Sequence, residues 1–527
     1  MLATIESSAI LGIDAYDVKV EVDVSAHIAY FAIVGLPDTG VMEAKERVRA
    51  AIKNSGLEFP LRRICVNLAP ADTKKQGPSF DLPVAIGILA ATGQVIAEDL
   101  REWLFVGELA LDGSVRPVSG ILPIALKARR DGMRKLVVPA ENAEEAAIVG
   151  GVQVYPVTSL LDAVALLNDR QTERAPVTAD PLELLASAAV DEFDFSDVKG
   201  QESVKRAMEV AAAGSHNLLL VGPPGSGKSM LARRFPSILA PMTLDEALEA
   251  TKIYSVSGQL ASAAATGDEE ASLISRRPFR APHHTISNAG LVGGGSSAMR
   301  PGEVSLCHNG VLFLDELPEF RRDALEVMRQ PLEDGHVTIT RVSGSLTYPA
   351  KFTLCAAMNP CRCGFFGDPV RECTCTPLQI RQYLQRISGP LLDRIDIHVE
   401  VPRLKSDELV KQGNGRHGES SATIRERVVA ARKIQEERFR NVKSGGLSLH
   451  CNAHMQSRHI HAYCKVSSDV SDLLRTAIAQ LSLSARAYDR VLKLARTIAD
   501  LAGTADIALP HVAEALQYRA LDRKLWG

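Results

Sequence analysis

A glycine-rich octapeptide, Gly222-Pro-Pro-Gly-Ser-Gly-Lys-Ser229, contains the residue types that bind nucleotide phosphates. It follows the apolar run Leu218–Val221 and precedes a helix-like segment, so its context is strand, glycine loop and helix. Glycines let backbone N–H groups turn inward around phosphates, and the next helix directs the positive end of its dipole at them. Lys228 supplies a cation to the β- and γ-phosphates, and Ser229 Oγ is placed to ligate Mg²⁺. We therefore expect an ATP and Mg²⁺ site made by Gly222, Pro223, Pro224, Gly225, Ser226, Gly227, Lys228 and Ser229.

A second acidic motif lies downstream, at the end of the apolar run in Gly310-Val-Leu-Phe-Leu-Asp-Glu316. A buried strand of this kind delivers Asp315 to Mg²⁺ and its waters, and Glu316 to the water that attacks the γ-phosphate. An Asp-Glu pair after an apolar run is a modest signal alone, but it is a strong one downstream of a P-loop. The two motifs together predict an ATPase.

Two further positions resemble the sensor residues of AAA+ ATPases. The apolar run Phe352–Met358 ends at Asn359, which matches the sensor-1 amide that holds the nucleophilic water. Ser484-Ala-Arg486 starts a long predicted helix, Ala485–Leu501, and resembles sensor 2, whose arginine reaches from the lid to the phosphates. The plainer alternatives are a strand-ending Asn-Pro turn for Asn359 and a solvated arginine for Arg486.

The segment Leu391-Leu-Asp-Arg-Ile-Asp396 resembles the part of magnesium-chelatase and replicative-helicase relatives that carries the arginine finger. A finger is a guanidinium that a neighbouring subunit supplies to the transition state, so hydrolysis then depends on assembly. Arg394 is the expected finger, and Arg381 and Arg386 are nearby competitors. The resemblance therefore implies an oligomer.

An insertion ahead of the acidic motif, Arg276-Arg-Pro-Phe-Arg-Ala-Pro-His-His-Thr285, separates this chain from a plain ATPase. It resembles an insert that lines or gates the ring pore in magnesium-chelatase relatives. Arg277 and Arg280 are candidates for DNA phosphates, and the glycines at 293–295 permit a mobile loop. The alternative is a structural loop packed against the acidic strand.

A β-hairpin is predicted just before the Asn359 strand, because Val337–Arg341 and Ser345–Tyr348 alternate and flank a Ser-Gly turn. Helicase-type AAA+ proteins carry a pore hairpin at this position. Arg341, near the tip, is either a contact to a DNA phosphate or a solvated surface arginine.

Four cysteines form two pairs, Cys361-Arg-Cys363 and Cys373-Thr-Cys375, with nine residues between the pairs. Four thiolates on two arms of a short loop can close a tetrahedral Zn²⁺ site. The one-residue spacer in each pair is tighter than the usual two, and coincidental free thiols are the alternative. We expect structural zinc at Cys361, Cys363, Cys373 and Cys375. The histidines and cysteines between His450 and Cys464 lack a clean ligand spacing, so we expect no metal there.

The composition is that of a globular chain with two to four domains, with 527 residues, 46% hydrophobic and 23% charged. The net charge of −3 means that a DNA site must be a local basic surface. The apolar stretch Leu82–Ala97 is too short to span a bilayer, and the N-terminus lacks a signal-peptide pattern. We expect a cytoplasmic protein without membrane contact, whose nine cysteines are reduced or metal-bound.

Residues 1–170 lack a P-loop and mix strand and helix patterns, which predicts an α+β domain. Val18–Val24 alternates at period two, Phe31–Val34 and Ile64–Leu68 are further strand candidates, and Leu82–Ala91 is predicted as a buried helix. Residues 171–190 contain two prolines and little periodicity, so we interpret them as a linker.

Motifs in this region, such as Gly77-Pro-Ser-Phe-Asp-Leu-Pro83, resemble the N-terminal domain of the ComM/YifB family of magnesium-chelatase-like AAA+ proteins. That domain is similar in fold to the Lon protease domain. Ser79 falls at the position of the Lon nucleophile, but Leu122 stands where Lon has its general-base lysine. A serine without a base is a poor nucleophile, so we expect a non-proteolytic domain, with Lys127 as the alternative base.

The resemblance to the ComM/YifB family covers essentially the whole chain and implies an α/β fold. A P-loop AAA+ core with a helical lid follows an α+β, Lon-protease-like N-terminal domain. The expected domains are residues 1–170, the linker at 171–190, the AAA+ core with its pore inserts and cysteine-rich loop at 191–403, and the magnesium-chelatase-like lid at 404–527.

The same resemblance implies a function. The expected protein is a hexameric, ring-forming, ATP-driven motor on single-stranded or branched DNA, a helicase or branch-migration enzyme. It would serve homologous recombination of incoming DNA in natural transformation, with recombination proteins as further partners. One alternative is a magnesium-chelatase-like remodeller of a protein partner, and another is a Lon-like protease.

Overall fold

The computed structural model forms two compact units. The first comprises Met1–Ala189 with Leu244–Ser275, and the second comprises Val190–Thr243 with Arg276–Gly527. The structure describes all residues except 76, 98, 170–173, 187–192, 261–271, 296–298, 342–343, 404–417, 441, 445–446, 482–483, 522–524 and 526–527. Parts of the predicted linker at 171–190 and the predicted start of the lid at 404 therefore lie outside the described residues.

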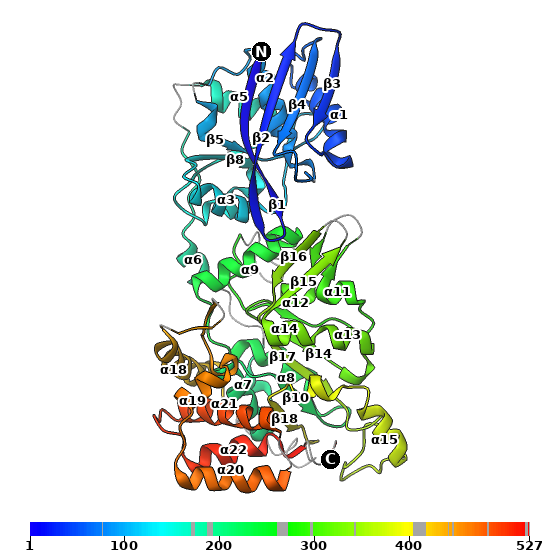
Figure 1. The fold of residues 1–527 in the computed structure, drawn as a ribbon, viewed down its shortest axis with the longest axis vertical. Coiled ribbons are helices and arrows are strands. Elements are labelled where there is room, and N and C mark those ends of the chain that lie inside the picture. Colours follow the sequence, from blue (N-terminus) through cyan, green and yellow to red (C-terminus); the bar gives the residue numbers. More distant parts are fainter. Residues whose placement is uncertain are drawn as a thin grey trace. The chain divides into compact units, whose positions relative to one another are not determined.

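The first unit is built on a seven-stranded mixed sheet with the order β3-β4-β2-β1-β5-β8-β9 (Figure 1). Every second residue of β2 from Val18 to Val24 is buried, which confirms the predicted period-two strand. The predicted strands Phe31–Val34 and Ile64–Leu68 lie within β3 and β4. The sheet contains β1 (Leu2–Leu11), β2 (Asp14–Ser25), β3 (Tyr30–Val34), β4 (Arg63–Ala69), β5 (Trp103–Phe105), β8 (Lys135–Pro139) and β9 (Gln153–Val157), and β6 (Glu108–Leu109) pairs with β7 (Val115–Arg116).

Helices complete the first unit, and α2 (Asp81–Ala91) is buried along almost its whole length, as predicted. The helix α9 (Leu244–Ser257) comes from the range expected for the AAA+ core, yet it packs within this unit. Ser255 Oγ donates to Glu145 at 2.5 Å, and Lys252 pairs with Asp14 at 3.0 Å. The other helices are α1 (Thr39–Asn54), α3 (Ile121–Arg130), α4 (Ala143–Ala147), α5 (Leu160–Asn168) and α6 (Pro181–Ala186).

The second unit is built on a five-stranded parallel sheet with the order β11-β14-β17-β10-β18. Its three central strands are buried throughout, so they read as continuous apolar runs. The strands are β10 (Leu218–Val221), β11 (Phe279–Arg280), β14 (Val311–Leu314), β17 (Thr353–Met358) and β18 (Ile397–Glu400). Three small antiparallel pairs join β12 (Gly293–Gly294) to β13 (Arg300–Pro301), β15 (His336–Arg341) to β16 (Gly344–Pro349), and β19 (Lys443–Ser444) to β20 (Leu447–Ser448).

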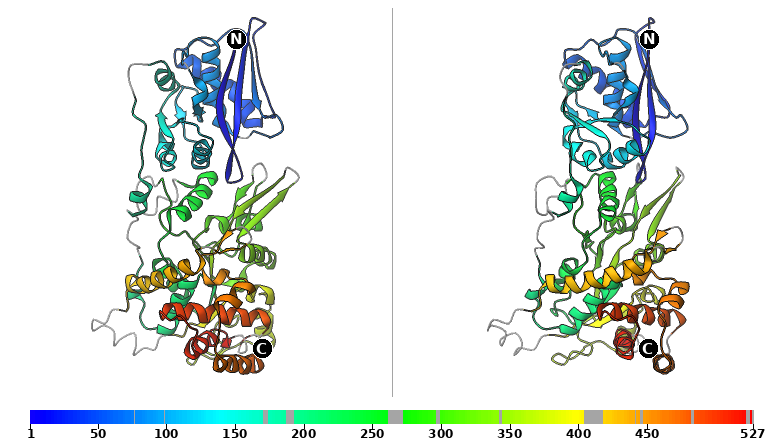
Figure 2. Two further views of the ribbon diagram at one scale, coloured as in Figure 1. Left: turned by 60° about the vertical axis from the view of Figure 1, so that its left-hand side comes forward. Right: turned by 90° about the vertical axis from the view of Figure 1, so that its left-hand side faces the viewer.

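The C-terminal helices of the second unit share one apolar core with the sheet. Helices α18 (Ser421–Phe439), α21 (Ala485–Leu501) and α22 (Leu509–Gln517) lie side by side, and α18 and α21 also contact α7 (Glu202–Gly214) (Figure 2). The remaining helices are α8 (Lys228–Arg234), α11 (Asn288–Val292), α12 (Glu303–Leu306), α13 (Arg322–Val327), α14 (Arg329–Asp334), α15 (Pro377–Leu384), α16 (Gly389–Leu392), α19 (Ser457–Tyr463) and α20 (Ser468–Leu481). Among the described residues, no helix has the length and apolarity needed to cross a bilayer.

Candidate active site

The carboxyl ends of neighbouring parallel strands bring the predicted nucleotide residues to one edge of the sheet. In register, Val221 of β10 lies opposite Met358 of β17, and Leu314 of β14 lies opposite Ala356 of β17. The P-loop, the Asp315-Glu316 pair and Asn359 each follow directly after one of these strands. Motifs that are distant in sequence therefore meet, because parallel strands end at the same edge.

The P-loop starts at a position that requires glycine. A Cβ at Gly222 would collide with the carbonyl oxygen of Val401, and Gly227 has the left-handed φ of 88° just before α8. The Gln201 side chain steadies the loop by donating to the Ser226 carbonyl at 2.7 Å. Ser226 Oγ is buried and has no hydrogen-bond partner among the described residues. A buried hydroxyl without a partner fits a loop that receives a phosphate.

Lys228 folds its ammonium back over the loop, and the residue as a whole is only 9% exposed. Its Nζ donates to the carbonyls of Gly222 and Pro223 at 2.8 and 3.0 Å, and to Asn359 Oδ1 at 3.2 Å. Burial lowers the pKa of Lys228, and the charges of Asp315 and Glu316 oppose that effect. Phosphate oxygens are stronger acceptors than these carbonyls, so Lys228 is poised to exchange them.

Ser229 and Asp315 form the oxygen pair expected for Mg²⁺. Ser229 Oγ donates to Asp315 Oδ2 at 2.5 Å, and a hydroxyl with a carboxylate is the type of ligand that Mg²⁺ prefers. Glu316 has a left-handed φ of 52°, and its Oε2 lies 3.4 Å from His284 Nδ1. Sequence reasoning did not assign His284, although the paired histidines of the insert were a visible signal.

Arg394 and Arg486 both act on Glu333 of α14, Arg394 by direct contact and Arg486 by its charge. The Arg394 guanidinium forms an ion pair with Glu333 and donates to the Pro390 carbonyl at 2.7 Å. The bond from Arg394 holds the pKa of Glu333 below its ordinary value, and the charge of Arg486 adds to this shift. Among the described residues, neither arginine has a hydrogen bond or an ion pair with the P-loop.

Two of the arginines proposed for DNA are engaged within the second unit. Arg277 donates to the carbonyls of Ala240 and Asn309 at 2.6 and 2.7 Å. Arg280 forms a two-pronged ion pair with Glu303 at 2.6 and 2.8 Å. These contacts are of the kind expected for the alternative, in which the insertion is a structural loop packed against the acidic strand.

The hairpin of β15 and β16 is present as predicted and packs on the glycines of the first insert. A Cβ at Gly293 would lie 2.7 Å from Ile339 Cδ1, and one at Gly294 would lie 3.5 Å from Arg341 Nη2. Arg300 is the strand partner of Gly294, so Arg300 and Arg341 both neighbour this glycine. Both arginines are exposed. The sequence pattern gave no reason to single out Arg300, because the pairing of β12 with β13 is a tertiary feature.

The two faces of this hairpin differ in chemistry. Val337, Ile339 and Tyr348 are buried. The exposed face carries hydroxyl groups in cross-strand pairs, with 3.1 Å between Thr338 and Thr347 and 3.2 Å between Thr340 and Ser345. Hydroxyl groups suit phosphate oxygens, whereas Arg341 alternates with Val337 and Ile339 and therefore belongs to the opposite face of the hairpin.

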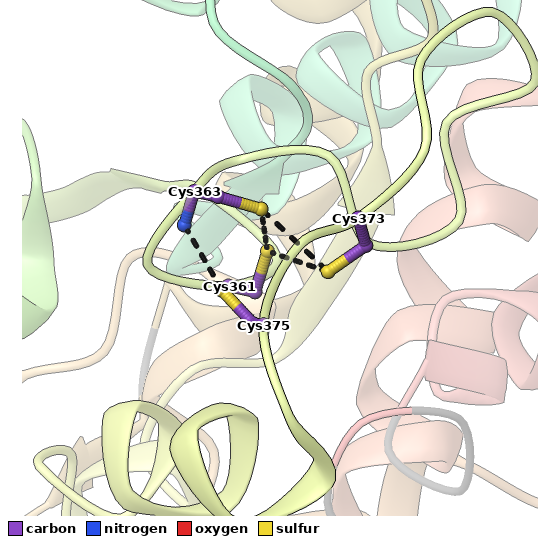
Figure 3. Close-up of side chains that lie close together, drawn as sticks. All are labelled: Cys361, Cys363, Cys373 and Cys375. Carbon is purple, nitrogen blue, oxygen red and sulfur yellow. Dashed lines mark hydrogen bonds between the residues drawn. The ribbon is translucent and has the colours of Figure 1, made fainter.

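The four predicted zinc ligands come together at the end of β17 (Figure 3). Their sulfur atoms all lie within 4.8 Å of one another. Cys361 Sγ is 3.3 Å from Cys363 Sγ and 3.7 Å from Cys373 Sγ, and Cys363 Sγ is 3.6 Å from Cys373 Sγ. Tetrahedral Zn²⁺ with Zn–S bonds of about 2.3 Å places its sulfurs about 3.8 Å apart. The donor set therefore fits Zn²⁺.

The lid histidines and cysteines form no comparable group among the described residues, where Cys451 Sγ pairs with His454 Nδ1 at 3.0 Å.

A buried polar network that sequence reasoning missed joins the segment before β10 to the lid. His216 is fully buried, and its ring nitrogens lie 3.1 Å from Asp396 Oδ2 and 2.8 Å from Thr497 Oγ1 of α21. Burial alone raises the pKa of Asp396, but His216, Arg490 and Lys493 outweigh it and lower this pKa to about 2. The neighbouring Asn217 side chain donates to the Arg394 carbonyl at 2.8 Å.

In the first unit, neither of the two residues considered as a base for Ser79 offers a free amine. Leu122 is fully buried in α3 and offers no amine. Lys127 Nζ forms ion pairs with Asp17 at 2.8 Å and with Asp131. Although burial lowers the pKa of Lys127, these carboxylates raise it above its ordinary value. A lysine that stays protonated is a poor general base.

Comparison with known proteins gives three family matches along the chain. Residues 194–409 match the magnesium chelatase subunit ChlI model, residues 20–142 match a second ChlI model of that chelatase, and residues 418–519 match the ChlI C-terminal model. Competence protein ComM from Haemophilus influenzae is 44% identical over 529 residues, which covers 99% of this chain and 98% of the relative. The protein YifB from Escherichia coli is 42% identical over 525 residues, with the same coverage of 99% and 98%.

A further match concerns only part of the chain. Lon protease from Rhizobium meliloti is 30% identical over 169 residues, which is 30% of this chain and 20% of that protease. The similarity to Lon is thus weak and partial.

Proposed function

Because the chain belongs to the ComM/YifB family of magnesium-chelatase-like AAA+ proteins, we propose that it is an ATP-driven, ring-forming DNA motor. In this proposal it is a helicase or branch-migration enzyme for homologous recombination of incoming DNA. The observation that carries the ATPase part is the meeting of Lys228, Ser229, Asp315 and Asn359 at one sheet edge. The name of the Haemophilus relative, competence protein ComM, supports DNA as the load.

The proposed hydrolysis uses side chains that already face one another. When ATP binds, Lys228 exchanges the carbonyls of Gly222 and Pro223 for β- and γ-phosphate oxygens. Ser229 and Asp315 would hold Mg²⁺, which would supply positive charge to the phosphates. Glu316 turns from His284 to orient the attacking water.

We propose that Arg394 completes the site of a neighbouring subunit in a hexamer, and that Arg486 reaches from the lid to the phosphates as sensor 2. In the single chain Arg394 is ion-paired with Glu333, and the charge of Arg486 also acts on this carboxylate. Exchange of Glu333 for the γ-phosphate of a neighbour gives Arg394 a different partner before and after assembly. Such a difference in interaction is what couples hydrolysis to the ring.

DNA contact is proposed on the hairpin of β15 and β16. Arg300 and Arg341, next to Gly294, offer guanidinium donors to phosphate oxygens, and the paired hydroxyls of Thr338, Thr340, Ser345 and Thr347 offer donors on the opposite face of the hairpin. Contacts of this type fix position without reading bases, so we expect binding without sequence preference. In this proposal Arg277 and Arg280 stabilise the insertion, because their guanidinium groups already bind backbone carbonyls and Glu303 within the second unit.

The test compares the ATPase rate of the full chain without DNA, with single-stranded DNA and with branched DNA, in low salt. We expect stimulation by both DNAs, and Lys228→Ala serves as the inactive control. A rate that ignores DNA, together with no DNA binding in ATP, would refute the motor and favour a chelatase-like remodeller of a protein.

The remaining assignments are parts of the same proposal. We propose that the first unit has a Lon-protease-like fold without protease activity, because Leu122 replaces the base and Lys127 is ion-paired. Peptidase activity that Ser79→Ala removes would contradict this. We also propose structural Zn²⁺ at the four cysteines and a cytoplasmic location, where such thiols stay reduced.

A further inference from the structure

The loop that carries the four cysteines, residues 360–376, lies directly on the P-loop. It starts one residue after Asn359, whose Oδ1 accepts from Lys228 Nζ at 3.2 Å. Gly364 of this loop, at φ +87°, is so close to the P-loop that a Cβ there would lie 2.5 Å from Pro224 Cδ. The cysteine loop therefore contacts the nucleotide site both through the chain at Asn359 and through space at Pro224.

The far part of the cysteine loop contacts Arg403, which lies just beyond β18. Arg403 Nη2 lies 3.6 Å from Asp368 Oδ2, and the Arg403 guanidinium lies 5.9 Å from the centre of the Phe365 ring. Asp368 also accepts from the N–H groups of Val370 and Arg371 at 2.8 and 3.0 Å. The loop thus spans from the end of β17, across the P-loop, to the end of β18.

Packing alone leaves this loop weakly fixed. Residues 360–376 contain no helix or strand, and of the four cysteines only Cys361 is buried. Beside the contact of Gly364 with Pro224, a cavity of 320 Å³ lies between part of the cysteine loop and the start of the P-loop, and its lining includes Gly222, Pro223, Phe366 and Asp368. A loop with few buried contacts opens easily unless a covalent or metal link holds it.

We propose that Zn²⁺ at Cys361, Cys363, Cys373 and Cys375 makes the cysteine loop a brace for the nucleotide site, so that metal occupancy sets how tightly ATP is held. The metal joins the arm next to Asn359 to the arm that leads to α15. With the two arms joined, Gly364 is held against Pro224 and Asn359 is held against Lys228. This inference rests on the nucleotide binding of the proposed function, and it needs neither DNA nor the ring.

The test measures zinc content and the Kd of a fluorescent ATP analogue for the full-length protein without DNA. Cys373→Ser removes a ligand whose sulfur neighbours the sulfurs of Cys361 and Cys363. Gly364→Ala keeps all four ligands but forces the loop away from Pro224. Cys65→Ser, in the first unit, is the matched control. Circular dichroism and hydrogen exchange of the P-loop accompany each measurement.

We expect about one zinc per chain in the native protein and in Gly364→Ala, and none in Cys373→Ser. Both loop variants should bind nucleotide about tenfold more weakly, the scale of one charged hydrogen bond, with faster hydrogen exchange in the P-loop. Returning zinc to chelator-treated native protein should restore the Kd.

Three results would overturn the inference. Native protein without any bound metal would contradict the metal site, and native protein that holds iron would contradict the assignment of zinc. A folded, zinc-free Cys373→Ser protein with native Kd and native exchange removes the brace. Failure of the DNA motor is a separate result, because an ATPase that ignores DNA would leave these measurements unchanged.

Discussion

Replacement of Asp396 by asparagine tests the buried network between the P-loop strand and the lid. The asparagine keeps the shape and an oxygen for the His216 ring, and it removes only the charge. Burial alone would raise the pKa of the Asp396 carboxylate, but His216, Arg490 and Lys493 lower it from 3.8 to about 2. That difference of about 1.8 pH units corresponds to about 2 kcal/mol of stability at neutral pH.

The sign of the pH dependence follows from a lowered pKa. Above the unfolded value, near pH 4, both states are ionised and the full contribution is present. As the pH falls from there toward 2, the unfolded chain takes up a proton first, and the contribution declines to about 1 kcal/mol at pH 3. Asp396→Asn should therefore destabilise by about 2 kcal/mol at pH 7 and by about half as much at pH 3.

The assay is urea unfolding at the two pH values. The transition to follow is the one that shifts when ATP and Mg²⁺ are added at pH 7, because a ligand stabilises the unit that binds it. Asp393→Asn is the control, because its carboxylate is 41% exposed and lies 3.9 Å from Arg490. It should change stability by less than about 0.5 kcal/mol. A loss in Asp396→Asn that is equal at pH 7 and pH 3, or absent at both, would refute the reasoning.

Other substitutions test the site more directly. Lys228→Ala should abolish binding of a fluorescent ATP analogue, since it removes the buried ammonium that the loop carbonyls hold; retained binding would contradict the site. Glu316→Gln should keep nucleotide affinity while the hydrolysis rate falls about 10²-fold or more, as expected for loss of the group that activates water, and native turnover would exclude that role. Arg300→Ala and Arg341→Ala should each weaken DNA binding equally for all sequences and lower the slope of log K against log salt by about one, measured by fluorescence anisotropy. Arg475→Ala, an exposed lid arginine, should leave that slope unchanged.

The candidate nucleotide site could be predicted from the sequence because the patterns that indicate it are local. The P-loop pattern and the Asp315-Glu316 motif each need a short stretch of chain with glycines, a lysine and carboxylates after an apolar strand. The hairpin and the paired cysteines follow from alternation and ligand spacing over a few residues. In each case the side chains and the backbone that positions them are close in sequence.

The rest was decided by tertiary structure. His284 meets Glu316, His216 meets Asp396 and Arg300 neighbours Gly294 only after the strands have paired. The engagement of Arg280 by Glu303 likewise depends on packing, because an arginine in a sequence does not reveal its partner. Helix α9 packs with the first unit although it is encoded inside the second. Periodicity and motifs carry information on local geometry, whereas long-range contacts depend on how whole elements bury their apolar faces.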